Sequence, residues 1–208
     1  MTSRYTLPAP VLTAASARRT RPGWHAATGR RTPVRANVGR EEMARQLWLL
    51  RHAEAEPHGT RADEKRRLTP RGERQARIAG AALARLEVDF EAVLFSPKAR
   101  AAQTAELAAQ RWDGGQAERL RVHRPLAGGF DAAQAREAAA GVGADARLLL
   151  VGHEPDLSQV VGDLTGGVVD LKKGGVAVVR LDGVRGELAL LLRPRDLALI
   201  AGVPADGE

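Results

Sequence analysis

The sequence predicts an α/β fold, a three-layer α/β/α sandwich whose central sheet is mostly parallel and has an antiparallel edge. Three apolar runs, at 46–50, 92–95 and 147–151, are too short for helices and are typical of buried parallel strands. Segments with helical periodicity separate these runs, as expected for a sheet covered by helices on both faces. Two further apolar runs, at 176–181 and 188–192, are joined by a Gly-containing turn and predict an antiparallel hairpin at the sheet edge.

The first helix follows the first strand after a polar loop. Thr69 and Pro70 predict where it starts, because Thr is a good N-cap and Pro fits the first helical position. Apolar residues recur at four-residue spacing from Ile78 to Leu86 and predict a stripe that packs on the sheet. We expect this helix to end near Glu87.

The second strand leads into the second helix. We expect Ser96 and Pro97 to cap and open this helix, which then runs to about Trp112. Arg100 would lie in its first turn, beside free backbone N–H groups and the positive end of the helix dipole. A guanidinium is unfavourable in that place unless it serves another purpose, and binding an anion is such a purpose.

The remaining sequence continues the alternation of helices and strands after Gly114 and Gly115 break the chain. We expect a short strand at 119–123, a helix at 131–140, the third apolar strand at 147–151, a helix at 155–164, the hairpin, and a last helix at 195–201.

Charge divides the chain into two parts. Residues 1–40 hold eight Arg and no acidic residue, whereas residues 41–208 hold 24 basic and 25 acidic residues and so carry a net charge of −1. We assign 46–203 to one folded domain and 1–45 to a disordered basic tail or a mis-called start, with Met43 as the alternative initiator. The composition of the tail also resembles an organellar targeting signal.

Composition further limits the functions that we expect. The net charge of +7 belongs to the tail, so the domain lacks the basic patch that a nucleic-acid-binding protein needs. No apolar run approaches the roughly 18 residues of a membrane span. We therefore expect a cytoplasmic protein, monomeric, that binds neither nucleic acid nor membrane.

Polar residues at three strand ends predict a catalytic site. Arg51 and His52 follow the first strand, Arg100 lies in the helix after the second, and His153 follows the third. The carboxyl ends of parallel strands meet at one edge of a sheet, where α/β folds bind ligands. Two guanidiniums offer forked donors for a tetrahedral oxyanion, and an imidazole can act as nucleophile or base. These residues predict a phosphate site.

The residue types favour a histidine nucleophile. The chain has no cysteine, which excludes thiolates, and no spacing typical of metal ligands, so we expect neither a metal nor another cofactor. His52 would attack phosphorus in line and form a phosphohistidine that water hydrolyses. Arg51, Arg100 and His153 would hold the phosphoryl oxygens as charge redistributes.

Four segments carry a family resemblance. They are Leu-Leu-Arg-His-Ala-Glu at 49–54, Leu-Thr-Pro-Arg-Gly-Glu-Arg-Gln-Ala at 68–76, Ser-Pro-Lys-Ala-Arg-Ala-Ala-Gln-Thr-Ala at 96–105 and Val-Gly-His-Glu-Pro at 151–155. Over about 46–200 the chain resembles the histidine phosphatase superfamily, and within it the short, SixA-like protein-phosphohistidine phosphatases. The resemblance implies a phosphoglycerate mutase-like fold, with His52 as the phosphorylated nucleophile and a phosphate pocket completed by Arg51, Arg100 and His153.

The sequence departs from larger members of this superfamily in its general acid. Those members carry a Glu after the second helix that protonates an alcohol leaving group, whereas the segment 119–136 has Asp131 as its only acid. Glu154 and Asp63 are possible replacements, although we interpret Glu154 more readily as a cap of the helix that follows it.

The lack of a clear acid bears on the substrate. An alkoxide needs a proton to leave, because its conjugate acid has a pKa near that of water, about 16. Imidazole titrates near ~6.5 and leaves easily once protonated. We therefore expect phosphohistidine on a protein as the substrate. The alternatives are a small-molecule phosphomonoesterase that uses the same four residues and a non-catalytic phosphate- or phosphoprotein-binding module.

Overall fold

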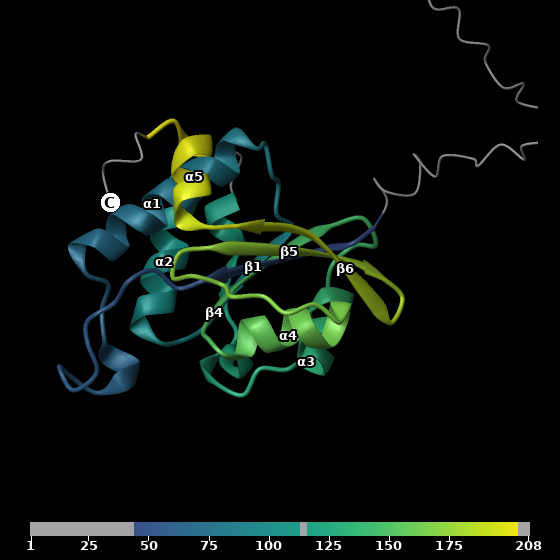
Figure 1. The fold of residues 1–208 in the computed structure, drawn as a ribbon, viewed down its shortest axis with the longest axis horizontal. Coiled ribbons are helices and arrows are strands. Elements are labelled where there is room, and N and C mark those ends of the chain that lie inside the picture. The colour runs from purple at the N-terminus through teal and green to yellow at the C-terminus, as the bar shows by residue number, and fades with distance from the viewer. Residues whose placement is uncertain (1–43, 113–115, 204–208) are drawn as a thin grey trace, which may run out of the picture. The chain divides into compact units, whose positions relative to one another are not determined.

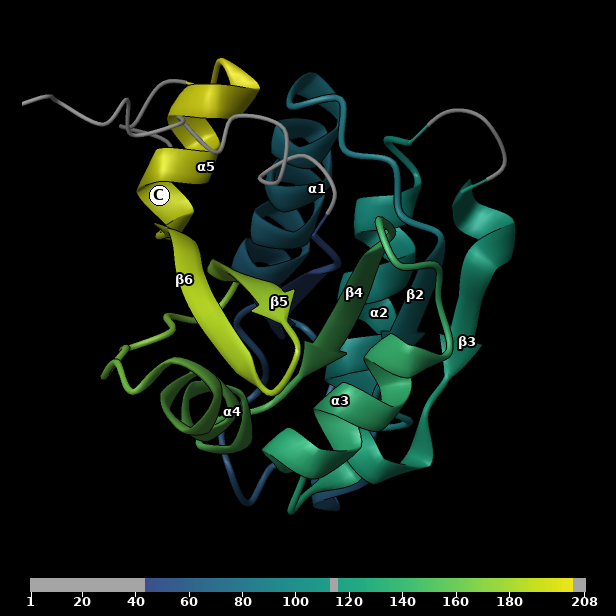
Figure 2. The ribbon, with the colours of Figure 1, turned by 90° about the vertical axis from the view of Figure 1, so that its right-hand side faces the viewer.

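The computed structural model describes residues 44–112 and 116–203. Within these residues a six-stranded sheet has the order β3-β2-β4-β1-β5-β6 (Figures 1 and 2). Its strands are β1 (Gln46–Arg51), β2 (Ala92–Phe95), β3 (Leu120–Val122), β4 (Arg147–Gly152), β5 (Val176–Asp182) and β6 (Arg185–Leu192). Strands β1 to β4 pair in parallel, whereas β5 is antiparallel to both β1 and β6. The predicted α/β fold with an antiparallel edge hairpin is confirmed.

Helices cover both faces of the sheet. They are α1 (Pro70–Arg85), α2 (Ala99–Ala109), α3 (Ala132–Ala140), α4 (Asp156–Thr165) and α5 (Pro194–Ala201), with short 3₁₀ helices η1 (Asp63–Lys65), η2 (Gln116–Arg119) and η3 (Arg124–Ala127). Figure 1 shows α1, α2 and α5 on one side of the sheet and α3 and α4 on the other. The helices and the sheet therefore form the three layers that the sequence predicts.

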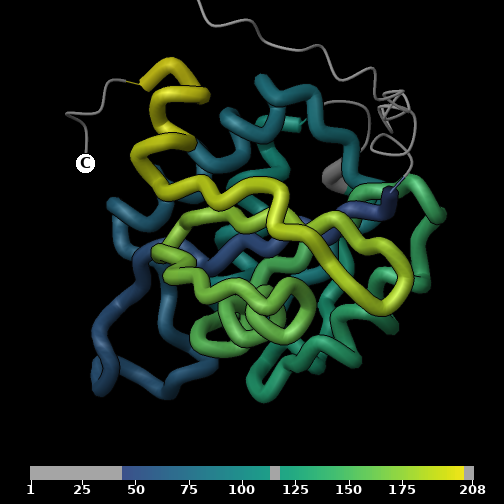
Figure 3. Tube along the Cα trace, turned by 45° about the vertical axis from the view of Figure 1, so that its right-hand side comes forward, coloured from purple at the N-terminus to yellow at the C-terminus, as the bar shows by residue number. Residues whose placement is uncertain are grey.

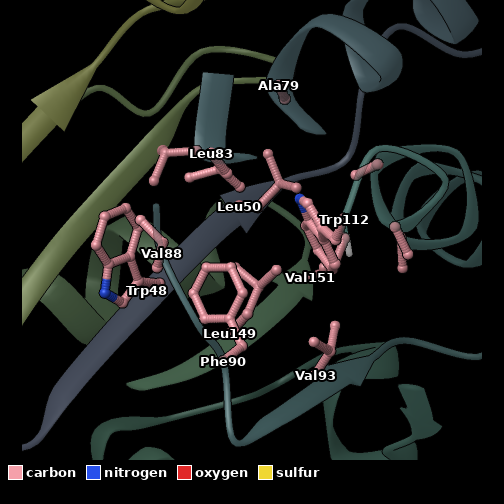
Figure 4. Packing of buried hydrophobic residues seen from close by; sticks show 14 of the residues in the cluster. Trp48, Leu50, Ala79, Leu83, Val88, Phe90, Val93, Trp112, Leu149 and Val151 are labelled. Carbon is pink, nitrogen blue, oxygen red and sulfur yellow. The ribbon is translucent and has the colours of Figure 1, made fainter. Parts of the chain in front are cut away.

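The central strands are buried on both faces. Trp48 and Leu50 of β1 pack with α1, α2 and α5 (Figure 4), whereas Leu47 and Leu49 pack with α3 and α4. None of the four is more than 4% exposed, and burying a large apolar side chain contributes roughly 1.5–3 kcal/mol. Burial on both faces explains why β1 is a continuous apolar run rather than an alternating one.

The helices and strands predicted in the described part of the chain are present. Thr69 is the N-cap of α1, as the sequence predicts. Pro70 is the first helical residue, and the Thr69 side chain accepts a hydrogen bond of 3.0 Å from the backbone N–H of Gly72. The helix ends at Arg85, close to its predicted end. A good N-cap of this kind contributes about 1 kcal/mol.

The predicted start of the second helix is wrong. Helix α2 begins at Ala99 rather than at Ser96-Pro97, with Lys98 as the N-cap and no side-chain cap hydrogen bond. The hydroxyl of Ser96 is instead hydrogen-bonded to an imidazole, as described below. Arg100 nevertheless lies in the first turn of the helix, as predicted.

Two glycines allow α1 to approach its neighbours closely. A Cβ atom at Gly72 would lie 1.8 Å from the carbonyl oxygen of Glu54, and one at Gly80 would lie 2.2 Å from that of Ala108. Only a residue without a side chain fits at either position. The first contact places α1 directly against the segment that follows β1.

Strands β1, β2 and β4 are parallel, so their carboxyl ends meet at one edge of the sheet. Figure 3 shows the segment between β1 and α1, in dark blue, at this edge and the β5–β6 turn at the opposite edge. No helix in the described ranges is long and apolar enough to cross a bilayer. The tail predicted at 1–45 lies, except for its last two residues, outside the described residues, and the assignment of 46–203 as one domain stays a prediction.

Candidate active site

The four residues predicted at the strand ends line one cavity. Arg51 and His52 lie at the end of β1, Arg100 lies in the first turn of α2, and His153 follows β4. All four line a cavity of about 520 Å³. The ring centroids of His52 and His153 lie 5.1 Å apart. The structure therefore brings together the side chains that the sequence predicts to act together.

The hydrogen bonds of His52 determine which ring nitrogen carries the proton. Its Nδ1 lies 2.7 Å from the carbonyl oxygen of Ala53. A carbonyl oxygen can only accept, so Nδ1 donates and Nε2 carries the lone pair. The Nε–H of Arg100 donates to this Nε2 over 3.3 Å. The nitrogen with the lone pair therefore lies next to a guanidinium that can bind an anion.

Burial keeps His52 in its neutral, nucleophilic form. The residue is 7% exposed. Burial lowers its pKa to about 3, against the opposing effect of the hydrogen bond to Ala53, and the charges of Arg100, Arg51 and Lys173 lower it further. At neutral pH the imidazole consequently needs no base to remove a proton before it attacks.

His153 is a second buried imidazole in this cavity. Burial lowers its pKa to about 3, with His52 and Arg100 as further causes. Its Nε2 lies 2.8 Å from the hydroxyl oxygen of Ser96, a fully buried residue that follows β2. Its Nδ1 is buried and has no hydrogen-bond partner elsewhere in the described chain. When Ser96 donates to Nε2, Nδ1 carries the proton and can donate to a phosphoryl oxygen.

Arg51 is anchored by main-chain groups. Its Nη1 donates to the carbonyl oxygen of Leu171 over 2.8 Å. Its backbone N–H donates to Gly175 and its carbonyl oxygen accepts from Gly174. Its Nε is buried without a partner in the residues that the structure describes. The guanidinium is thus held in place and retains a donor for a bound anion.

Asp63, from η1, holds Arg100 in position. Arg100 Nη1 donates to the carbonyl oxygen of Asp63 over 2.7 Å, and Nη2 donates to its carboxylate over 3.3 Å. Lys98 and Arg66 donate to the same carboxylate at 3.0 and 2.8 Å. These hydrogen bonds, that of Lys98 first, hold the pKa of Asp63 well below its usual range. Asp63 thus anchors Arg100, and its role as a possible general acid stays a prediction.

Glu154 is one of four carboxylates that line the cavity, with Glu56, Asp63 and Asp156. Helix α4 begins at Asp156 with Pro155 as the N-cap and no side-chain cap hydrogen bond, so the interpretation of Glu154 as a cap is wrong. Glu154 lines the cavity, and its Oε1 is buried without a hydrogen-bond partner among the described residues. Its carboxyl group can therefore reach a substrate that enters the cavity.

Thr104 joins the end of β1 to α2. Its hydroxyl accepts from the backbone N–H of Ala53 over 3.1 Å and donates to the carbonyl oxygen of Arg100 over 2.7 Å. The residue is fully buried. A single side chain thus links the main chain beside His52 to the main chain of Arg100, which contacts His52.

Three basic residues of the cavity were not predicted as site residues: Arg66, Lys98 and Lys173. Lys98 could have been predicted from the sequence, because it lies with Arg100 in the motif at 96–105. Arg66 and Lys173 lie in polar segments whose sequences resemble ordinary loops. No three His, Asp or Glu side chains within 44–112 and 116–203 are grouped as a metal site would require. The cationic lining suits an oxyanion.

Comparison with known proteins agrees with this geometry. The family model of the histidine phosphatase superfamily (branch 1) matches residues 47–124. An uncharacterized protein of Picosynechococcus sp. is 34% identical over 163 residues, which cover 72% of this chain and 97% of that protein. Two solved structures are also similar to the chain.

The first is the protein histidine phosphatase SixA complexed with tungstate, with a TM-score of 0.63, 26% identity, and coverage of 73% of this chain and 99% of that one. The second is a protein provisionally assigned as phosphohistidine phosphatase SixA of Nakamurella multipartitia, with a TM-score of 0.60, 28% identity, and coverage of 73% and 96%. The chain therefore belongs to the histidine phosphatase superfamily and, within it, to the SixA-like branch.

Proposed function

We propose that this protein is a phosphatase that removes phosphate from phosphohistidine on a protein, with His52 as the nucleophile. The observation that carries the proposal is the state of His52. Its Nδ1 donates to a carbonyl oxygen, so the lone pair is on Nε2, and this atom lies beside Arg100 in an open cavity. A neutral imidazole next to an anion-binding guanidinium is ready to attack phosphorus.

In the first step, the Nε2 lone pair of His52 forms a bond to phosphorus while the P–N bond to the substrate imidazole breaks. The phosphoryl group passes to His52, and the substrate imidazole, whose other ring nitrogen has already taken a proton from solvent, leaves as neutral imidazole. Arg51, Arg100 and His153 hold the phosphoryl oxygens through the donors that face the cavity.

In the second step, water attacks phosphorus and the bond to His52 Nε2 breaks. Inorganic phosphate leaves, and the lone pair returns to Nε2. His52 keeps its proton on Nδ1 throughout, because the carbonyl oxygen of Ala53 accepts it in both steps.

The acids of the cavity support a P–N bond as the bond that is cleaved. Asp63 is held ionised by its cationic neighbours, and the other carboxylates that line the cavity are Glu56, Glu154 and Asp156. Of these, Glu154 has a buried oxygen without a hydrogen-bond partner among the described residues. An imidazole leaving group needs little help from an acid, because it is a far weaker base than an alkoxide. The SixA structure that this chain resembles holds tungstate, a tetrahedral oxyanion like phosphate.

The test is phosphate release by the full-length chain from two substrates, a histidine-phosphorylated protein and p-nitrophenyl phosphate, in buffer with EDTA. We expect fast turnover of the first and slow turnover of the second. Faster turnover of small phosphate esters would instead favour a small-molecule phosphomonoesterase with Glu154 as its acid. Binding of phosphate without turnover of either substrate would favour a non-catalytic phosphate-binding module.

A further inference from the structure

A second cavity adjoins the catalytic cavity. It has a volume of about 420 Å³ and is bordered by the first turn of α1, the segment 172–173 and the start of α5. The two cavities share Arg51 and Lys173 in their linings. A substrate larger than phosphate that is bound at His52 can therefore extend into it.

The lining of this second cavity is strongly basic. It contains one carboxylate, Glu54, and six cationic side chains: Arg51, Arg71, Lys172, Lys173, Arg193 and Arg195. The catalytic cavity, by contrast, mixes five cationic side chains with four carboxylates. Because residues 41–208 carry a net charge of only −1, the excess of cations is a local feature of this surface.

The fold neutralises this excess only in part. Arg71 pairs with Glu54 at 3.6 Å and Arg195 pairs with the next residue at 3.5 Å, both with well-exposed guanidiniums, and Lys172 pairs with Asp170. Within the described ranges no ion pair involves Lys173 or Arg193. Solvated cations of this kind add little to stability, and they remain available to an anionic partner.

A much smaller hollow of about 20 Å³ adjoins the second cavity between α1 and α5, which pack side by side (Figures 1 and 2). The hollow shares Arg71, Gln75 and Pro194 with the second cavity and adds Arg74 and the half-buried Ile78. We name the second cavity and this hollow together the α1–α5 groove. A small molecule with one further anionic group would pair with only part of this basic surface, whereas an acidic polypeptide segment can pair with cations along all of it.

We propose that the α1–α5 groove binds an acidic polypeptide segment of the substrate protein that flanks the phosphorylated histidine. The proposal rests on the proposed function and extends it to the class of phosphoprotein. Aspartate and glutamate side chains of the segment pair with the cations of the groove, and an apolar residue beyond them packs on the half-buried Ile78. This contact adds affinity for protein substrates without touching the reacting atoms.

The experiment compares phosphohistidine peptides of equal length whose flanking residues are acidic, neutral or basic. We expect the full-length chain to have a kcat/KM about tenfold higher for the acidic than for the neutral peptide at low ionic strength, as several exposed ion pairs together provide. Salt at about 0.5 M should largely remove this preference by screening. The charge-reversal variant Arg193→Glu/Arg195→Glu should lower the ratio to about one.

The matched control reverses two exposed charges away from the groove, Arg121→Glu/Arg185→Glu, and should keep the preference of the parent. Lys172→Glu, on the other side of the groove, provides a second variant if the first does not fold. Equal kcat/KM for all three peptides with the parent would overturn the groove proposal alone, and so would an unchanged preference in both groove variants. Failure of the parent to hydrolyse any of the peptides would overturn the proposed function.

Discussion

At the scale of single residues, the proposed mechanism depends on the lone pair of His52 Nε2. His52→Ala removes the atom that attacks phosphorus, so we expect phosphate release to fall to background and no phosphorylated protein to form. The measurement is phosphate release, together with trapping of the phosphoenzyme by rapid acid-free quenching, because phosphohistidine is labile to acid. A His52→Ala protein with near-normal turnover would rule out the nucleophile.

The two arginines are expected to contribute through charge stabilisation. Arg100→Ala removes the donor beside His52 Nε2, and Arg51→Ala removes a donor anchored at Leu171. Loss of one such group typically costs at least ~100-fold in kcat. The exposed residue Arg121 supplies the control, since Arg121→Ala should leave kcat unchanged. A loss below about fivefold for either site variant would contradict its assigned role.

Glu154 distinguishes the two substrate classes. Glu154→Gln removes a proton donor but keeps the shape of the side chain, and general acid catalysis contributes about 100- to 10,000-fold where the leaving group needs it. We expect hydrolysis of alkyl phosphates to fall by at least ~100-fold and hydrolysis of phosphohistidine to fall by less than about tenfold. Equal losses for both substrates would show that the acid is needed for the P–N bond as well.

At the scale of elements, the contact between α1 and the segment after β1 is a backbone-to-backbone packing contact. An added methyl group at Gly72 would lie 1.8 Å from the carbonyl oxygen of Glu54, and overpacking of this kind costs about 1–3 kcal/mol or more. We expect Gly72→Ala to lower the free energy of unfolding by roughly that amount, measured by urea denaturation. Activity should fall as well, because the displaced segment begins beside His52.

The control for this prediction is Gly162→Ala in α4, where the nearest atom to an added Cβ is the carbonyl oxygen of Gly167 at an ordinary 3.4 Å. Without a clash, Ala is better than Gly in a helix by about 1 kcal/mol. The two substitutions should therefore shift the free energy of unfolding in opposite directions. A stabilising effect of Gly72→Ala would show that α1 can move away from Glu54.

The elements also show what the sequence can and cannot predict. Strand β1 and helix α1 follow from local patterns, a continuous apolar run and a Thr-Pro start, and both were predicted. The start of α2 was predicted wrongly, because the Ser96 hydroxyl bonds to His153, a residue 57 positions away. Arg66 and Lys173 were not predicted as site residues for a related reason. The hydrogen bonds of Arg66 lie within its own loop, to Asp63 and to the carbonyl oxygen of Glu56, and only the fold brings this loop and Lys173 to the cavity that also holds His153.

At the scale of the whole molecule, the two buried histidines link stability to pH. Their pKa values are about 3 in the folded protein against 6.5 for ordinary histidine, so between these values the unfolded state binds more protons. Above pH 6.5 both states leave these histidines neutral, so the pH has no effect through them. As the pH falls from 6.5 toward 3, the unfolded state is stabilised by protons that the folded state does not bind, and the folded protein becomes less stable. We expect the free energy of unfolding to fall between about pH 7 and 5, by up to about 1 kcal/mol per pH unit for each histidine.

Urea denaturation at several pH values measures how the free energy of unfolding changes in this window. The window lies above the pH at which ordinary carboxylates titrate. His153→Gln should remove about half of the slope. His58→Gln is the control, because the His58 side chain is 85% exposed and does not belong to the buried pair. A slope that both variants leave unchanged would show that His153 is not held neutral by the fold.

The carbonyl group that orients the nucleophile has a consequence for redesign of the protein. It belongs to the main chain of Ala53, so no side-chain substitution can delete it, and the backbone amide of the same residue is itself held by Thr104. We therefore expect that side chains which line the cavity without contacting His52 can be substituted while Nδ1 of His52 keeps its proton. Substitutions at these lining positions should change which phosphorylated molecules fit without changing the orientation of the His52 ring. Directed evolution toward new substrates would therefore begin there.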